Sequence, residues 1–138
     1  MLMPYGQGAV HFRNGRSEPS HEINLLTPVS VAAPFTVSGP FHAIGAVLTP
    51  LGWAELTGLS AAEHGNRFCR AGELLDPELD RLGAGWCAAY RAGEMSGADC
   101  AAALGGWIGA HLNPLPEGHR RLIGLAAMWL SSDLDPDL

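Results

Sequence analysis

Hydrophobic and polar positions follow two different periods along this chain. Short apolar runs rich in β-branched residues, separated by Gly and Pro, occupy the first third. Runs of this kind predict strands joined by tight turns. After Pro50 the apolar residues recur at helical spacing almost to the end of the sequence. The pattern therefore predicts an α+β protein, with a small antiparallel sheet or partial barrel over residues 8–48 and four or five helices over residues 50–131.

The strand candidates become longer and more apolar toward residue 48. The short candidates are Ala9–Arg13, His21–Leu26, Val29–Ala32 and Phe35–Val37. Asn14-Gly15, directly after the first of them, is a strong turn signal. Phe41–Leu48 is the longest and most apolar run, so it is predicted to be the central strand of the sheet, buried on both faces.

The helical part begins at Pro50 and is divided by recognisable caps. Leu51–Leu56 predicts a short helix that ends at Gly58. Ser60 and Glu63 have the spacing of a capping box, which predicts a second short helix. The three longer predicted helices start at Asp76-Pro77, at the capping box of Ser96 and Asp99, and at Pro116, and they run to Gly93, Leu112 and about residue 131.

The chain is expected to form one domain over residues 1–138. Its sheet part covers residues 1–49, its helical part residues 50–132, and residues 133–138 begin a linker or a further helix. Asp135-Pro136-Asp137-Leu138 repeats the helix-start signal of Asp76-Pro77-Glu78-Leu79. We therefore expect the chain to be part of a longer polypeptide.

Charge and cysteine content narrow the classes of function. The net charge is −6, and all eight basic residues are arginines. An acidic chain repels phosphate backbones, so this segment is not expected to bind nucleic acid by itself. The three cysteines form no C-x-x-C pair, which argues against a disulfide framework or a zinc site and favours the cytoplasm. Neither a signal peptide nor a membrane-spanning segment is predicted, so we expect no contact with a membrane.

No catalytic or metal-binding motif stands out. The six histidines show neither H-x-H nor H-x-x-x-H spacing, so no two are placed to share one metal ion. No serine lies in a G-x-S-x-G elbow, and Gly83-Ala84-Gly85 lies inside a predicted helix instead of after a strand. The helix that starts at Pro116 offers only Arg120 and Arg121 for base contacts, which argues against a recognition helix. We expect no enzymatic activity, no catalytic residue, no metal ligand and no cofactor.

Three residues are candidates for a ligand pocket. His11 and His42 each lie within an apolar strand, where a side chain that points into a partial barrel could hydrogen-bond a ligand. A histidine satisfied within the core is the alternative for both. Trp53 follows directly from the predicted central strand, so it can contact both the sheet and the helices; a role as a core residue is its alternative.

The middle of the chain resembles the sensor region of AraC-type bacterial transcription regulators. Phe35–Trp53 is similar to the pattern G-P-x-x-x-x-G-(V/I)-x-(F/L)-x-P-x-G of that group, and Leu56–Glu63 to its L-x-G-x-S-A-x-E helix. Trp129–Leu138 looks like the junction that leads into the first DNA-binding helix. The order of sheet, pivot, helices and junction is also the same, although the sheet looks shorter than a full sensor barrel.

The resemblance implies a regulatory domain. It would bind an unknown small-molecule effector, form a homodimer, and contact DNA only through a helix-turn-helix domain beyond Leu138. Helices 76–92 and 96–112 are the candidates for the dimer interface, on account of their amphipathic faces and small residues. The residues expected there are Leu82, Trp86, Leu104 and Trp107. Two alternatives remain open: a stand-alone, cupin-like small-molecule-binding protein or enzyme, and a structural interaction module without a pocket.

Overall fold

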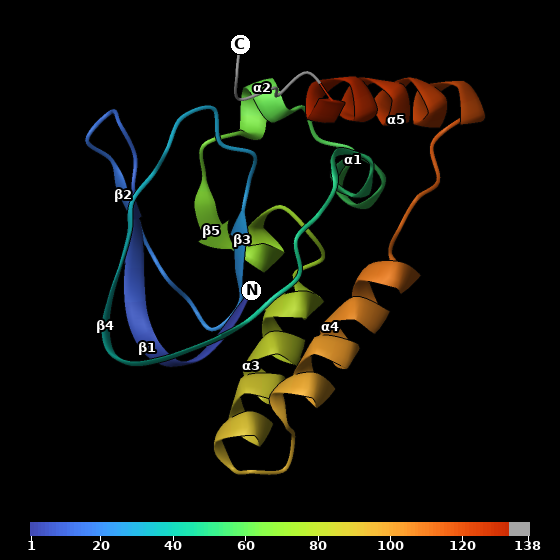
Figure 1. The fold of residues 1–138 in the computed structure, drawn as a ribbon. Helices are drawn as coiled ribbons and strands as arrows, with labels where there is room; N and C mark the ends of the chain where they lie inside the picture. The colour runs from blue at the N-terminus through green and yellow to red at the C-terminus, as the bar shows by residue number, and fades with distance from the viewer. Residues whose placement is uncertain (133–138) are drawn as a thin grey trace.

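The computed structural model describes residues 1–132 and confirms the α+β class, with small antiparallel sheets in the N-terminal part followed by helices (Figure 1). The prediction for residues 133–138 lies outside the described residues. The strands are β1 Leu2–His11, β2 Ser17–Pro19, β3 Asn24–Leu26, β4 Phe35–Ile44 and β5 Phe68–Arg70. The helices are α1 Pro50–Thr57, α2 Ala61–His64, α3 Glu78–Arg91, α4 Gly97–Ala110 and α5 Glu117–Ser132, with a 3-10 turn, η1, at Ala71–Glu73.

The larger sheet has the strand order β2-β1-β4, and all its pairs are antiparallel. The central strand is thus β1, and the prediction that Phe41–Leu48 is central and buried on both faces is wrong. Residues 35–43 of β4 are all exposed, and the strand ends at Ile44. The prediction equated apolar content with burial, whereas β4 lies at the edge of the sheet. The first half of β1 was missed because Pro4 and Gly6 resemble loop residues.

Two further details of the strands differ from expectation. The two strands predicted at Phe35–Val37 and Phe41–Leu48 are joined in one strand, β4, which runs from Phe35 to Ile44. The chain passes through Gly39 with a left-handed φ of 74° and continues to pair with β1. The segment Val29–Ala32 forms no strand. In the second sheet β3 pairs with β5, which joins segments about forty residues apart in the sequence. No periodicity distinguishes β5, because it is only three residues long.

Most helix boundaries follow the predicted caps. The Thr49 hydroxyl accepts a hydrogen bond from Gly52 N, and Gly58 ends α1 with a φ of 62°. The capping box of Ser96 and Asp99 is formed with both of its hydrogen bonds. The Ser60 side chain, by contrast, makes no capping hydrogen bond, so the capping box expected there is absent. The Glu63 carboxylate lies instead 4.0 Å from Nε2 of His64, at an exposed position.

The main core lies between the sheets and helices α3 and α4. Leu2 and Ile23 reach it from the N-terminal part, Leu79 and Cys87 from α3, and Leu104 from α4. Gly83 lets α3 approach Ile23, because a β-carbon at this glycine would lie only 2.7 Å from the Ile23 Cβ. Close packing at this point fixes α3 against the N-terminal part of the chain.

Helix α5 lies apart from α3 and α4, beside α1 (Figure 1). Within the described residues much of its apolar side is left uncovered: Leu122 is 67% exposed and Met128 is 70% exposed, while Ile123 is half-buried. The first turn of α5 is attached to α1, because Arg120 Nε lies 3.3 Å from the nearly buried Glu55 carboxylate. None of the helices in residues 1–132 has the length and apolar character needed to cross a membrane.

Candidate functional site

His11 connects all three strands of the larger sheet. Its Nδ1 lies 2.7 Å from the Ser17 hydroxyl on β2, and its Nε2 lies 2.7 Å from the Thr36 hydroxyl on β4. Both ring nitrogens therefore have protein partners, and a ligand would have to displace one of them. The geometry fits the alternative reading of His11, a histidine satisfied by its own fold.

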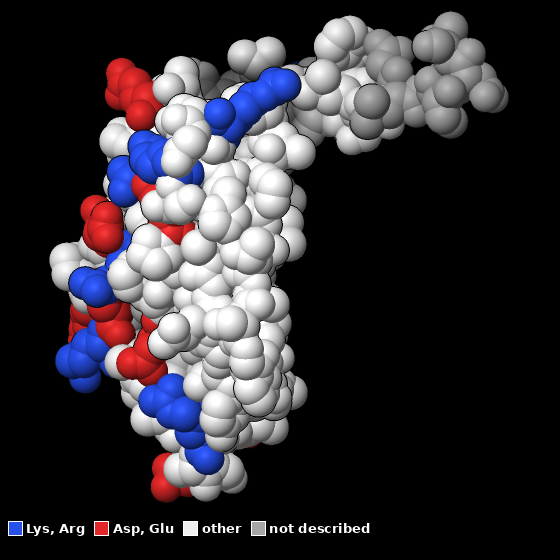
Figure 2. All heavy atoms as spheres, turned by 90° about the vertical axis from the view of Figure 1, so that its left-hand side faces the viewer, with Lys and Arg blue, Asp and Glu red and all other residues white. Residues whose placement is uncertain are grey.

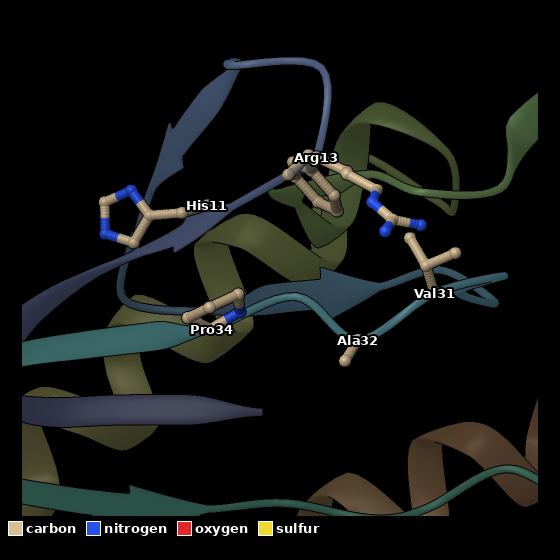
Figure 3. Close-up of a pocket in the computed structure, with 6 residues that line it drawn as sticks. His11, Arg13, Val31, Ala32 and Pro34 are labelled. Carbon is tan, nitrogen blue, oxygen red and sulfur yellow. The ribbon is translucent and has the colours of Figure 1, made fainter.

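An open hollow lies beside His11, where β1 ends and the segment before β4 passes close to it (Figure 3). Its volume is about 460 Å³. Val31 and Pro34 give it an apolar wall, and the Arg13 side chain points toward Val31 in the close-up. Among residues 1–132 no acidic partner of Arg13 is found. A free guanidinium beside apolar side chains can bind a small organic anion, because it offers paired N–H donors to a carboxylate.

His42 lies toward the other end of β4 and contacts the helical layer. Its Nδ1 is 2.6 Å from the Tyr90 hydroxyl on α3. The His42 ring also meets the Tyr5 ring of β1 edge-on, with 5.0 Å between the ring centroids. His42 and Tyr90 thus form a hydrogen-bonded bridge between the edge strand and α3, at an exposed position.

Trp53 is a core residue with 8% of its surface exposed. Its indole N–H donates to the Leu59 carbonyl at 3.0 Å, which closes the turn after α1. Trp53 belongs to the core cluster that joins the N-terminal part to the helices, which fits the alternative reading of Trp53 as a core residue. A half-open hollow at the edge of this core, lined by Leu79 and Trp107 among others, measures only about 40 Å³, room for about one water molecule and not for an effector.

The three predicted pocket residues do not form one pocket. His11 lines the hollow, His42 contacts α3, and Trp53 is enclosed in the core. Thr36, the partner of His11, pairs with Ala9 of β1, and His42 pairs with Tyr5, so the two are four β1 positions apart, roughly 13 Å at the rise of an extended strand. Sequence reasoning missed Arg13 and Tyr90. Arg13 is adjacent to a turn signal, and Tyr90 lies in the helix predicted to start at Asp76-Pro77, where helical spacing assigns it no chemical role.

The four predicted dimer residues lie mainly against the chain's own core. Leu104 is 5% exposed, and Trp86 and Trp107 are half-buried and pack on the main core cluster. Leu82 is half-buried. The outer side of α4 is made of small residues, and a β-carbon at Gly105 would meet no atom within 4 Å. The dimer remains a prediction, but these four side chains offer a partner little surface.

The cysteines are buried thiols. Cys69, Cys87 and Cys100 are reduced and at most 3% exposed. Burial raises the pKa of the Cys87 thiol to about 11, and it raises the pKa of Cys69 and Cys100 as well. A thiol is a poor nucleophile until it is deprotonated, so none of the three is suited to catalysis at neutral pH. Within residues 1–132 no three His, Cys, Asp or Glu side chains are grouped as a metal site would need.

Comparison with known proteins gave no relative: no family model, no curated protein and no solved structure matches this chain.

Proposed function

We propose that this chain is the effector-sensing and dimerisation region of an AraC-type transcription regulator, and that it controls a helix-turn-helix domain located beyond Leu138. The observation that carries the proposal is the course of β4. One strand connects the open hollow at its N-terminal end with α3 at its C-terminal end. A ligand that moves β4 would therefore act on the helices.

The path from the hollow to α3 consists of direct contacts. Pro34 lines the hollow and its carbonyl accepts a hydrogen bond from His11 N at 2.9 Å, so the start of β4 is tied to β1. Eight residues after Pro34 the strand has reached the bridge between His42 and Tyr90. Tyr90 lies on α3, which packs against α4 in the core. An effector would bias two arrangements of these elements, which is the thermodynamic requirement for allostery.

In this proposal helix α5 transmits the conformational change to the downstream domain. Its first turn is attached to the body through Arg120 and Glu55, and its later turns expose Leu125 and Met128. An exposed apolar helix face is costly in water and usually marks an interaction site. We assign this face to the downstream domain, because α5 leads directly to the junction sequence. DNA contact would come from that domain alone, since this chain has a net charge of −6.

The class of the protein is tested by DNA binding of the longer polypeptide. We expect it to bind DNA from upstream of its own gene, with an affinity that falls steeply as salt rises, and we expect residues 1–138 alone not to bind. A downstream sequence without a helix-turn-helix, or a longer polypeptide with no affinity for DNA, would contradict the proposal.

The coupling through β4 is tested by a matched pair of tyrosine variants in the longer polypeptide. Tyr90→Phe removes the hydroxyl that meets His42, whereas Tyr5→Phe leaves that bond intact while also altering a ring beside His42. A hydrogen bond of this kind contributes about 1 kcal/mol, so Tyr90→Phe should change DNA affinity by up to about fivefold. Tyr5→Phe should leave the affinity unchanged. Equal effects of the two variants would show that the bridge does not couple sheet and helices.

A further inference from the structure

Strand β4 has the composition of a buried strand and the position of an edge strand. No Asp, Glu, Lys or Arg occurs between Glu22 and Glu55, a stretch that contains all of β4. Phe35, Val37 and Phe41 are 39%, 47% and 37% exposed. Edge strands are normally protected from pairing by charged side chains, bulges or a covering element. Along residues 35–38 β4 has none of these protections within the described residues, because its register shift against β1 and the positive φ of Gly39 come only after Ser38.

The free edge of β4 also presents unpaired backbone groups. His11 N donates to Pro34 O, which makes these two residues a hydrogen-bonded pair of the β1–β4 ladder. Such pairs alternate along antiparallel strands, so Phe35 and Val37, opposite Val10 and Gly8, turn their N–H and C=O groups away from β1. Since β2 is on the other side of β1, these groups point to the edge where no described strand pairs.

The charges of the molecule favour a second copy as the partner at this edge. The space-filling view from the side of the sheet shows a broad uncharged face, with acidic and basic side chains gathered along one margin (Figure 2). Two chains of charge −6 repel each other over most orientations. Contact through β4, which lies in the stretch without charged side chains, keeps the charged residues of the two copies apart and buries Phe35 and Val37 at the same time.

We propose that two copies of this chain pair through antiparallel β4 strands, with Val37 opposite Val37 of the second copy at the two-fold axis. In this register Pro34 lies opposite Pro40 of the second copy. The backbone groups of Pro34 face β1 and not the second copy, so the N–H that proline lacks is not needed for the new ladder. The outward N–H and C=O groups of Val37 bond to those of its counterpart, as the closest hydrogen-bonded pair of the new ladder. A self-complementary patch of this kind produces a closed dimer.

This contact would be the interface of the homodimer in the proposed function. The inference rests on the proposed function only in expecting a dimer. It is tested on the 138-residue chain without DNA. A failure here is therefore distinguishable from a failure of the longer polypeptide to bind DNA.

The experiment measures molar mass against concentration by sedimentation equilibrium. We expect a reversible dimer of twice 14.5 kDa. Val37→Lys places two like charges opposite each other, and Val37→Pro removes an outward N–H without breaking a β1–β4 bond; each should weaken the dimer at least about tenfold. Met128→Lys, on the exposed face of α5, is the matched control and should leave the dimer unchanged. Circular dichroism confirms that each variant is folded.

A crosslink tests the register without weakening the dimer. Val37→Cys supplies one accessible thiol, because the native cysteines are buried. Directly opposed residues of a hydrogen-bonded pair are about 5.5 Å apart at Cα, within the range of a disulfide. Mild oxidation should therefore give a covalent dimer from Val37→Cys and none from Met128→Cys. A monomeric wild-type chain, a dimer that tolerates both Val37 substitutions, or a dimer lost only with Met128→Lys would each overturn the proposal.

Discussion

Two glycines of α3 should respond in opposite ways to the same substitution. Gly83 faces the core, where an added β-carbon would lie 2.7 Å from the Ile23 Cβ and 2.8 Å from its Cγ2. Gly85 is exposed, and no atom lies within 4 Å of the position of its β-carbon. Ile23 cannot retreat easily, since its backbone bridges to Leu2 and its carbonyl accepts a hydrogen bond from Ala71 N.

The expected free-energy changes follow from these two environments. In a helix interior, alanine is favoured over glycine by about 1 kcal/mol. Gly85→Ala should therefore stabilise the protein by up to about 1 kcal/mol. At Gly83 the same gain is opposed by overpacking, which costs about 1–3 kcal/mol in a close-packed core. The two variants should thus differ by about 1–3 kcal/mol, with Gly83→Ala the less stable.

The measurement is urea unfolding followed by tryptophan fluorescence and circular dichroism, with the free energy of unfolding taken from the midpoint and slope. Adding Ile23→Ala removes Cγ2 and Cδ1 but keeps the Cβ, so it should relieve part of the cost of Gly83→Ala while leaving the effect of Gly85→Ala unchanged. If Gly83→Ala and Gly85→Ala stabilised the chain equally, α3 would not pack on Ile23 as described, and the placement of the helical layer would be refuted.

Three further predictions concern the thiols and α5. All three cysteines should resist iodoacetamide at neutral pH and react fully in denaturant, because they are buried; fast labelling of the native chain, measured by mass spectrometry, would contradict this. The folded chain holds the Cys87 proton until about pH 11 while the unfolded chain releases it near pH 9, so the free energy of unfolding should decline between these values, and less steeply in Cys87→Ala. Glu55→Gln should weaken the hold on Arg120 and speed amide hydrogen exchange in α5 but not in α3; unchanged exchange in α5 would show that the ion pair does not anchor it.

The helical part of the fold could be predicted well from the sequence, because its signals are local. Gly58, Gly93 and the Ser96 capping box act through their own backbone and one neighbouring turn, so sequence spacing determines them. The arrangement of the strands could not be predicted in the same way. Which strand is central depends on pairing between distant segments, and the apolar content of β4 does not reveal that no strand in residues 1–132 pairs with its other edge.

The candidate site was predictable only in part for the same reason. His11 and His42 were singled out by their place in apolar strands, and both are in side-chain hydrogen bonds with residues distant in the sequence. His11 and His42 lie near different ends of β4, and this placement is determined by the register between β4 and β1. Tyr90 could not be paired with His42 from periodicity, since the two are 48 positions apart. Arg13 lines the hollow because the chain before β4 passes beside it, and no local sequence pattern predicts that approach.

The central claim is that this region governs a downstream DNA-binding domain by holding two copies of it together. It is tested most directly by comparing, at one salt concentration, the DNA affinity of the longer polypeptide with that of its isolated downstream domain, measured by fluorescence anisotropy. Linking two binding modules raises affinity by a factor of about 10²–10⁴, so the longer polypeptide should bind a paired site more tightly by at least the lower value. Equal affinities would contradict the account.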